Sequence, residues 1–354
     1  MTTKTKVSKK DERKACILGH IVHTYVSDGT PVSSKLVARR MGGNVSSATI
    51  RNIMAELEHQ GYITHPHTSA GRIPTDIGYR HYVDVIKNRI RFERREAQRL
   101  AEEYSKRIRT IKEVIKKTSY LISRELHNAG VVMWPGIEGV YLKHMDLVKV
   151  NSETILAVLV TMTNDVKNHI VRLDGELKKT ELMRITNYIN ENFRTLPLMD
   201  ISGSLRGLVN NVKEEDKETL SIAKNSLRVM DTIIEENLKN EIYWEGLNYF
   251  LEMSGSGDVD MTRNILEIFS EKEELVNLMR NELPYEGLNV YIGNENKSKK
   301  LSECSVITCG YTLHGRAAGR LGVIGPTRMD YDHALRTVGC LSNLISKKLA
   351  EINS

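Results

Sequence analysis

The 354-residue sequence is poor in the features that mark disulfide-rich or membrane-spanning proteins. It has only 4 cysteines and no CxxC pair, which argues against a disulfide framework and is typical of a reducing compartment. A redox switch through Cys304 and Cys309 is the alternative. The longest apolar run, around residues 155–160, is far shorter than the roughly 20 residues that cross a bilayer. The first residues are charged, with no apolar signal segment behind them. We therefore expect a cytoplasmic protein with no membrane partner.

The sequence also lacks the motifs of common enzyme classes: GxxxxGK[ST], GxGxxG after a strand, GxSxG and HExxH. The glycine-rich run from Gly315 to Gly325 favours a close approach of sheet and helix, followed by a turn, over phosphate binding. The pairs His20/His23 and His65/His67 have no third ligand at metal-binding spacing, so surface or DNA-facing imidazoles are favoured. We expect no enzyme, no cofactor and no metal.

Charge is distributed unevenly along the chain. Residues 1–130 hold 25 Lys and Arg against 13 Asp and Glu, a net +12, whereas the whole chain carries +6. Such a basic region fits nucleic acid or an anionic membrane, and the lack of an amphipathic helix with large exposed apolar residues favours nucleic acid. A merely solvated basic surface is the alternative. Arg316, Arg320 and Arg328 can form an anion site or simple surface charge, and the sequence leaves both open.

The most informative stretch covers residues 46–80. Ser46 or Ser47 can cap a helix that presents one apolar face, formed by Ile50, Ile53, Met54 and Leu57. The opposite face carries polar and charged side chains, several of them of the types that bond bases or phosphates in DNA. They are Ser47, Thr49, Arg51, Asn52 and Glu56. We expect base contacts from Arg51 and Asn52.

A β-hairpin is predicted after Gly61, with residues 62–64 and 72–74 as its strands. A ribbon with Arg72 and two imidazoles near its tip can lie along a minor groove or a phosphate ridge. The full set of DNA-binding candidates is Ser46, Ser47, Thr49, Arg51, Asn52, His65, His67, Thr68, Ser69 and Arg72.

The preceding segments decide how this stretch is interpreted, because a helix and a hairpin also occur together in proteins that never contact DNA. Residues 11–27 pattern as a helix, Ser33 or Ser34 can cap a second helix over 35–41, and glycines make a tight turn at 42–44. Helix, helix, turn, helix and hairpin is the order of a winged helix-turn-helix.

Three segments carry a family resemblance: GYITHPHTSAGRIPTDIGYRHYVD, VSSATIRNIMAELE and GPTRMDY. They closely resemble the bacterial heat-inducible transcription repressor family HrcA, over essentially the whole chain and most weakly between about residues 195 and 290. The resemblance implies a homodimeric repressor that binds the CIRCE inverted repeat in double-stranded DNA ahead of chaperone operons. It also implies dependence on the GroE chaperonin, loss of activity on heating, and association with the nucleoid when bound. The rival hypothesis is a regulator that senses a small molecule through a GAF-like domain.

We predict a multidomain α+β protein. Its expected parts are a basic tail (1–10), a winged-helix domain (11–86), a long connecting helix (87–129), an antiparallel α+β domain (130–196 and 285–354) and a mostly helical insert (197–284). The family resemblance implies that the α+β domain is GAF-like and that the insert is a dimerisation domain. The connecting helix is predicted from apolar residues three and four apart, and its seam can serve self-association or an intramolecular contact.

Overall fold

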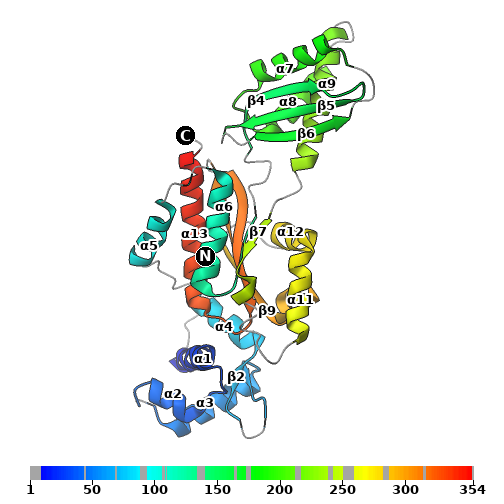
Figure 1. Cartoon of the computed structure of the whole chain (residues 1–354). Helices are drawn as coiled ribbons and strands as arrows, with labels where there is room; N and C mark the ends of the chain where they lie inside the picture. Colours follow the sequence, from blue (N-terminus) through cyan, green and yellow to red (C-terminus); the bar gives the residue numbers. More distant parts are fainter. Residues whose placement is uncertain are drawn as a thin grey trace.

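The structure of the protein is a computed structural model of the whole chain. It describes residues 9–43, 45–67, 70–87, 94–105, 108, 110–133, 140–162, 166–172, 177–211, 217–237, 242–249, 259–281, 287–313 and 316–352. These form a mixed α+β protein in which all described strand pairs are antiparallel. Figure 1 shows the N-terminal helices at one end, a five-stranded sheet in the middle and a three-stranded sheet at the other end. Among the described helices, none is long and apolar enough to cross a bilayer.

The N-terminal unit comprises four helices and a two-stranded hairpin. Its elements are α1 (Lys9–Asp28), α2 (Ser34–Arg40), α3 (Ser47–His59), β1 (Ile63–Thr64), β2 (Ile73–Pro74) and α4 (Asp76–Lys87). The apolar residues predicted for one face of α3 are all buried. Val32 pairs with Arg72 through two backbone hydrogen bonds of 2.8 and 2.9 Å. This isolated bridge places the segment before α2 beside the second strand of the hairpin. Gly71 permits this approach, because a Cβ there would lie 2.6 Å from the carbonyl oxygen of Pro31.

The predicted connecting helix over 87–129 is two helices, α5 (Arg94–Ser105) and α6 (Ile111–Leu126). Thr110 has extended backbone angles and forms a capping box with Glu113, so a new helix begins there. The two helices fold back on each other: the hydroxyl of Tyr104 bonds that of Thr118, and Glu103 lies 3.0 Å from Lys117. The expectation of one continuous helix was therefore wrong, because its apolar seam is buried by an intramolecular turn.

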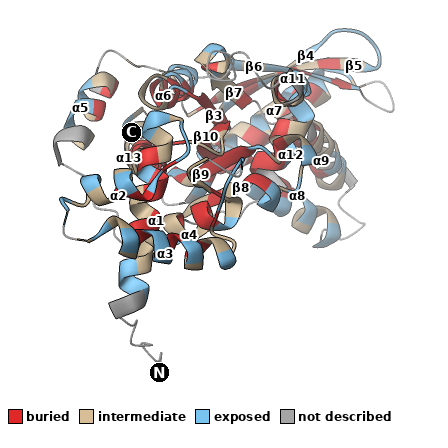
Figure 2. Ribbon diagram, turned by 90° about the horizontal axis from the view of Figure 1, so that it is seen from below, coloured by how far each residue is buried: buried red, intermediate tan, exposed pale blue. Residues whose placement is uncertain are grey.

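The central sheet has the strand order β7-β3-β10-β9-β8. Its strands are β3 (Ala129–Met133), β7 (Ile242–Glu245), β8 (Leu288–Ile292), β9 (Cys304–Leu313) and β10 (Arg316–Pro326). Helices α6 and α13 (Tyr331–Ile352) cover one face, and α11 (Val259–Ser270), α12 (Lys272–Asn281) and the 3-10 turn η3 (Lys299–Leu301) cover the other. Figure 2 shows β3 and most of β9 and β10 as buried ribbons among partly exposed helices.

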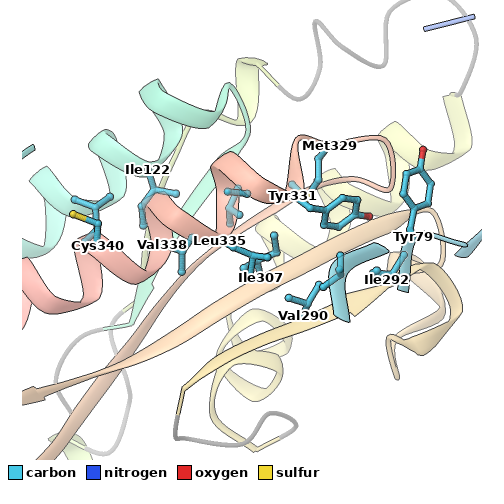
Figure 3. Close-up of a cluster of buried hydrophobic side chains, with 14 of the residues drawn as sticks. Tyr79, Ile122, Val290, Ile292, Ile307, Met329, Tyr331, Leu335, Val338 and Cys340 are labelled. Atoms are coloured by element: carbon cyan, nitrogen blue, oxygen red, sulfur yellow. The ribbon is translucent and has the colours of Figure 1, made fainter. Parts of the chain in front are cut away.

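Neighbouring residues of the central strands enter two different cores. Val306 packs with α11 and α12, whereas Ile307 packs with α6 and α13, as the two-residue period of a strand requires. The cluster on the α13 face continues without a break into the N-terminal unit. We call it the shared core; its members include Ile17, Val83 and Ile307. Figure 3 shows the part where Tyr79 from α4 meets Tyr331 and Met329.

The strand period also bears on the predicted redox pair. Cys304 and Cys309 are five residues apart on β9, and Cys304 belongs to the core beneath α11 and α12, whereas Cys309 packs against the shared core. Side chains on opposite faces of one strand cannot reach each other. A disulfide between these two thiols would therefore require β9 to change its backbone conformation.

A separate domain is built on the sheet β4-β5-β6. Its elements are β4 (Leu142–Lys149), β5 (Thr154–Thr161), β6 (Val166–Arg172), α7 (Lys179–Asn192), α8 (Leu198–Asn211) and α9 (Lys217–Asn237), and they enclose a core of their own. We predicted that β4 to β6 would join the C-terminal strands in one sheet, with an insert at 197–284. Instead, the described part of the inserted unit runs from 140 to 237 and includes these strands, whereas β7, α11 and α12 pack on the central sheet.

The shared core predicts which leucines support the fold. Leu335 on α13 is fully buried, whereas Leu266 on α11 is 42% exposed. Leu335→Ala should destabilise the protein by about 2–5 kcal/mol, because it removes buried methylene groups and leaves a cavity. Leu266→Ala, the matched control, should cost about 1 kcal/mol or less. Urea unfolding followed by circular dichroism measures both, and equal losses would contradict the assignment.

Candidate nucleic-acid interface

The first turn of α3 is fixed by its own hydroxyl groups. The Oγ of Ser46 accepts a hydrogen bond from the backbone N–H of Thr49 at 3.1 Å and lies 2.9 Å from Oγ1 of Thr49. The N-cap predicted at Ser46 or Ser47 is therefore Ser46. The Oγ of Ser47 lies 3.1 Å from that of Ser34, so Ser47 joins α3 to the start of α2. These hydroxyls set the position of the helix N-terminus, where a phosphate is electrostatically favoured.

Arg51 and Asn52 lie next along α3, and both are exposed. The buried face of the same helix, which includes Ile50 and Ile53, packs into the N-terminal unit. Within the described part of the chain, neither Arg51 nor Asn52 forms a side-chain hydrogen bond or ion pair. A guanidinium and an amide on the solvent side of a capped helix have the geometry to reach base edges in a major groove.

The last turn of α3 is tied to the hairpin by one carboxylate. Glu58 accepts from Nδ1 of His65 at 2.6 Å and from Nε of Arg72 at 2.9 Å. A second nitrogen of Arg72, Nη2, lies 2.8 Å from the same carboxylate. We call these three residues the Glu58 triad. Two of the predicted DNA-contacting residues are thus held in place by an acidic partner on α3.

The triad changes the protonation of its carboxyl group. Burial alone would raise the pKa of Glu58, but the hydrogen bonds from His65 and Arg72 outweigh it and hold that pKa below its usual value. Glu58 therefore stays ionised into mildly acidic solution and keeps the hairpin docked on α3. The triad offsets part of the positive charge of the hairpin. Among the predicted DNA-contacting residues, Arg51 on the N-terminal half of α3 therefore carries a positive charge that no described acidic side chain offsets.

The remaining candidates are placed as follows. His67 is exposed, and Thr68 and Ser69 lie outside the described residues. His23 Nδ1 lies 3.5 Å from Nη1 of Arg40, and burial, followed by the charges of His23 and Arg40, lowers the pKa of His20. Among described residues, no three His, Cys, Asp or Glu side chains converge on a metal position.

Sequence reasoning identified candidate residues, but it missed ion pairs within the N-terminal unit and polar contacts between this unit and the central domain. It placed Glu56 with the reading residues, whereas Glu56 lies 2.8 Å from Lys14 of α1. It gave Glu58 no role, although an acidic residue one helical turn before a hairpin that carries His65 and Arg72 was the available signal. It also gave no role to Asp76 and Arg80, which contact the central domain.

Comparisons with known proteins agree on one family. A family model for the HrcA protein C-terminal domain matches residues 112–335. The chain is 33% identical over 347 residues to the heat-inducible transcription repressor HrcA of Syntrophobacter fumaroxidans, with 98% of each chain covered. It is 34% identical over 341 residues to that of Geobacter sulfurreducens, covering 96% of this chain and 98% of the relative. A crystal structure of a hypothetical protein at 2.2 Å resolution shares the fold, with 24% identity, a TM-score of 0.63, and coverage of 98% of this chain and 100% of that one.

These matches place the protein in the class of heat-inducible transcription repressors. The chain belongs to the HrcA family of heat-inducible transcription repressors. The family resemblance stated from the three sequence segments is confirmed.

The Glu58 triad predicts a pH-dependent contribution to stability. A carboxyl group whose folded-state pKa is depressed stabilises the protein above its unfolded pKa of about 4.3, and this stabilisation is lost as pH falls through the folded-state pKa. Glu58→Gln should therefore lower the melting temperature at pH 7, and the difference from wild type should shrink as pH falls below the unfolded pKa and through the lower folded-state pKa of Glu58. Glu153→Gln, in the turn before β5, controls for the loss of an exposed carboxylate. A difference that stays constant with pH would contradict the triad's role.

Proposed function

We propose that this repressor binds DNA through a winged helix-turn-helix formed by α1 to α3 and the β1–β2 hairpin. In this proposal the N-terminal half of α3 enters the major groove, and the hairpin lies at the flanking backbone or minor groove. The exposure of Arg51 and Asn52 on the capped end of α3 carries the proposal. The net charge of +12 over residues 1–130 supports a polyanionic partner.

The proposed operator is the CIRCE inverted repeat, read by a homodimer. A two-fold axis relating two copies of α3 matches the symmetry of an inverted repeat, in which each half-site takes one reading helix. Repression of chaperone genes by this route would take place in the cytoplasm, on the nucleoid.

The exposed outer face of the three-stranded sheet supports the proposal that the partner is a second copy of the chain. The inner face of the sheet packs on α7, α8 and α9, whereas its outer face presents apolar residues to solvent. Val148, Val166 and Ile170 on this face are 51%, 62% and 61% exposed, and Leu156 lies between Val148 and Ile170 in register. An exposed apolar patch of this kind marks an interaction surface. We therefore assign dimerisation to this domain, in place of the predicted insert at 197–284.

Regulation would follow from the stability of the active state. We propose that the central domain is GAF-like, that the GroE chaperonin maintains the DNA-binding form, and that heat lowers the active fraction by diverting the chaperonin to other unfolded proteins. The joining of the N-terminal unit to the central domain by the shared core supports this, because loss of packing in one would disturb the other.

The reading role of Arg51 predicts a sequence-specific loss. Arg51→Ala should weaken binding to a CIRCE duplex by about 1–3 kcal/mol, or roughly 5–150-fold, because a bidentate contact with guanine is removed. Binding to a scrambled duplex should change far less. Fluorescence anisotropy across a salt series measures both affinities.

Arg39→Ala is the matched control, since Arg39 is an exposed arginine on α2. It removes the same charge from the same unit and should weaken both duplexes alike, or neither. If wild type binds both duplexes equally with a steep salt dependence, the chain reads only phosphate charge and the proposed specificity is wrong.

The outer face of the three-stranded sheet predicts the oligomeric state. Ile170→Glu should convert dimer to monomer, because it places a charge within an apolar contact. Met183→Glu, on α7, changes a residue that is also exposed, at 55%, but lies away from this face, and it should leave the dimer intact. Sedimentation velocity distinguishes the two, with circular dichroism checking that both variants fold. A dimeric Ile170→Glu variant would exclude this face.

A further inference from the structure

Helix α4 belongs to both the N-terminal unit and the central domain. It packs on α1 and β2 within the N-terminal unit and on α13 and β8 of the central domain. Gly78 lies against the backbone of Tyr62, where a side chain would overlap the carbonyl oxygen. The next residue, Tyr79, is 3% exposed, and its ring centroid lies 5.5 Å from that of Tyr331 (Figure 3). The helix is therefore a shared structural element and not a flexible linker.

Two polar contacts secure the first half of α4 to the central domain. Asp76 accepts from the backbone N–H of Asn294 at 3.2 Å and from its Nδ2 at 3.1 Å. Arg80 donates from Nε to Oε1 of Glu295 at 2.7 Å, and from Nη2 to the carbonyl oxygen of Val290 at 2.6 Å. Residues four apart on a helix share one face, so both contacts meet the same loop.

The loop that receives α4 is shaped for this contact. It contains the 3-10 turn η2 (Gly293–Glu295), in which Glu295 also accepts from the backbone N–H of Ile292 at 2.9 Å. Asn296 donates from Nδ2 to the carbonyl oxygens of Gly293, Leu301 and Cys304, which pins the loop to the sheet. Gly293 has φ +53°, and a Cβ there would overlap the carboxylate of Asp76.

A third contact holds the other side of the N-terminal unit. Gly29, in the turn between α1 and α2, has φ +68° and lies against the guanidinium of Arg328, where a side chain would overlap it. Arg328 belongs to the GPTRMDY segment that leads into α13. The N-terminal unit is thus fixed at two separated points as well as through the shared core, which leaves it little freedom to rotate.

We infer that the pairs Asp76–Asn294 and Arg80–Glu295 form a latch that fixes the orientation of α3, so that operators are discriminated by the spacing between their half-sites. This inference rests on the proposed function as a dimeric DNA reader. Fixing α3 on the central domain removes one hinge between the two reading helices of a dimer, so a dimer with this latch should accept fewer separations along the duplex than one whose N-terminal units turn freely. The hydrogen bond with Glu295 also raises the pKa of Arg80, so the guanidinium group of the latch stays charged.

The latch is tested with Glu295→Gln and a matched control, Asp84→Asn. Both remove one carboxylate near Arg80, because Asp84 lies 3.6 Å from it. Asp84 is on α4 itself, however, so only Glu295→Gln removes an ion pair between the two parts of the molecule. Asn294→Ala, which removes one donor to Asp76, is the second latch variant. Melting temperatures confirm that each variant folds.

Four duplexes are compared for each protein: an inverted repeat with its normal spacer, the same repeat with the spacer shortened by about 2 base pairs, the same repeat with the spacer lengthened by about 2 base pairs, and a single half-site. Wild type and Asp84→Asn should lose at least tenfold in affinity when the spacer changes. Glu295→Gln and Asn294→Ala should reduce that ratio at least threefold while keeping wild-type affinity for the half-site.

A wild-type spacing ratio in both latch variants would overturn the latch while leaving the repressor proposal intact. Loss of half-site affinity in step with full-operator affinity would also overturn it, because that pattern reports damage to the reading surface itself. If wild type cannot distinguish the repeat from a scrambled duplex, the proposed function fails first.

Discussion

The central sheet must be covered on both faces, because each strand sends alternate apolar residues to opposite sides. Helices α6 and α13 cover one face, and α11 and α12 cover the other. The first pair of helices then determines the position of further elements: α5 packs on α13 and bonds α6, while α4 packs on α13 and β8. The placement of the N-terminal unit is therefore a consequence of how the sheet is covered.

The N-terminal unit could be predicted closely from sequence because its signals are local. A serine cap, a 3.6-residue apolar period and a turn glycine each act within a few residues, and Ser33, Ser46 and Gly71 take the positions that their chemistry favours. The sheets could not be predicted in the same way. Strand β3 pairs with β10 and β7, which come much later in the chain, and no local pattern records such a partner.

The same limit applies to the helix predicted over 87–129 and to the candidate interface. An apolar seam is satisfied equally by a partner helix and by a turn that folds the chain back, so periodicity alone could not locate the break at Thr110. Likewise, Arg72 and His65 could be selected as an arginine and an imidazole near a hairpin tip, but their acidic partner comes from α3 and appears only when the hairpin is folded against that helix. The outward display of Arg51 did follow from helix periodicity.

The unbroken core between α1 and α13 places the packing of α3 and that of the central sheet in one continuous cluster. In a repressor whose domains fold independently, the DNA-binding units could stay folded and bound to DNA after the other domains had unfolded. In this molecule, opening of the sheet would remove the packing beneath α4, and under the proposed mode of DNA binding the same transition would release the repressor from DNA. Under the proposed function, temperature then acts on gene expression through the packing of this continuous core.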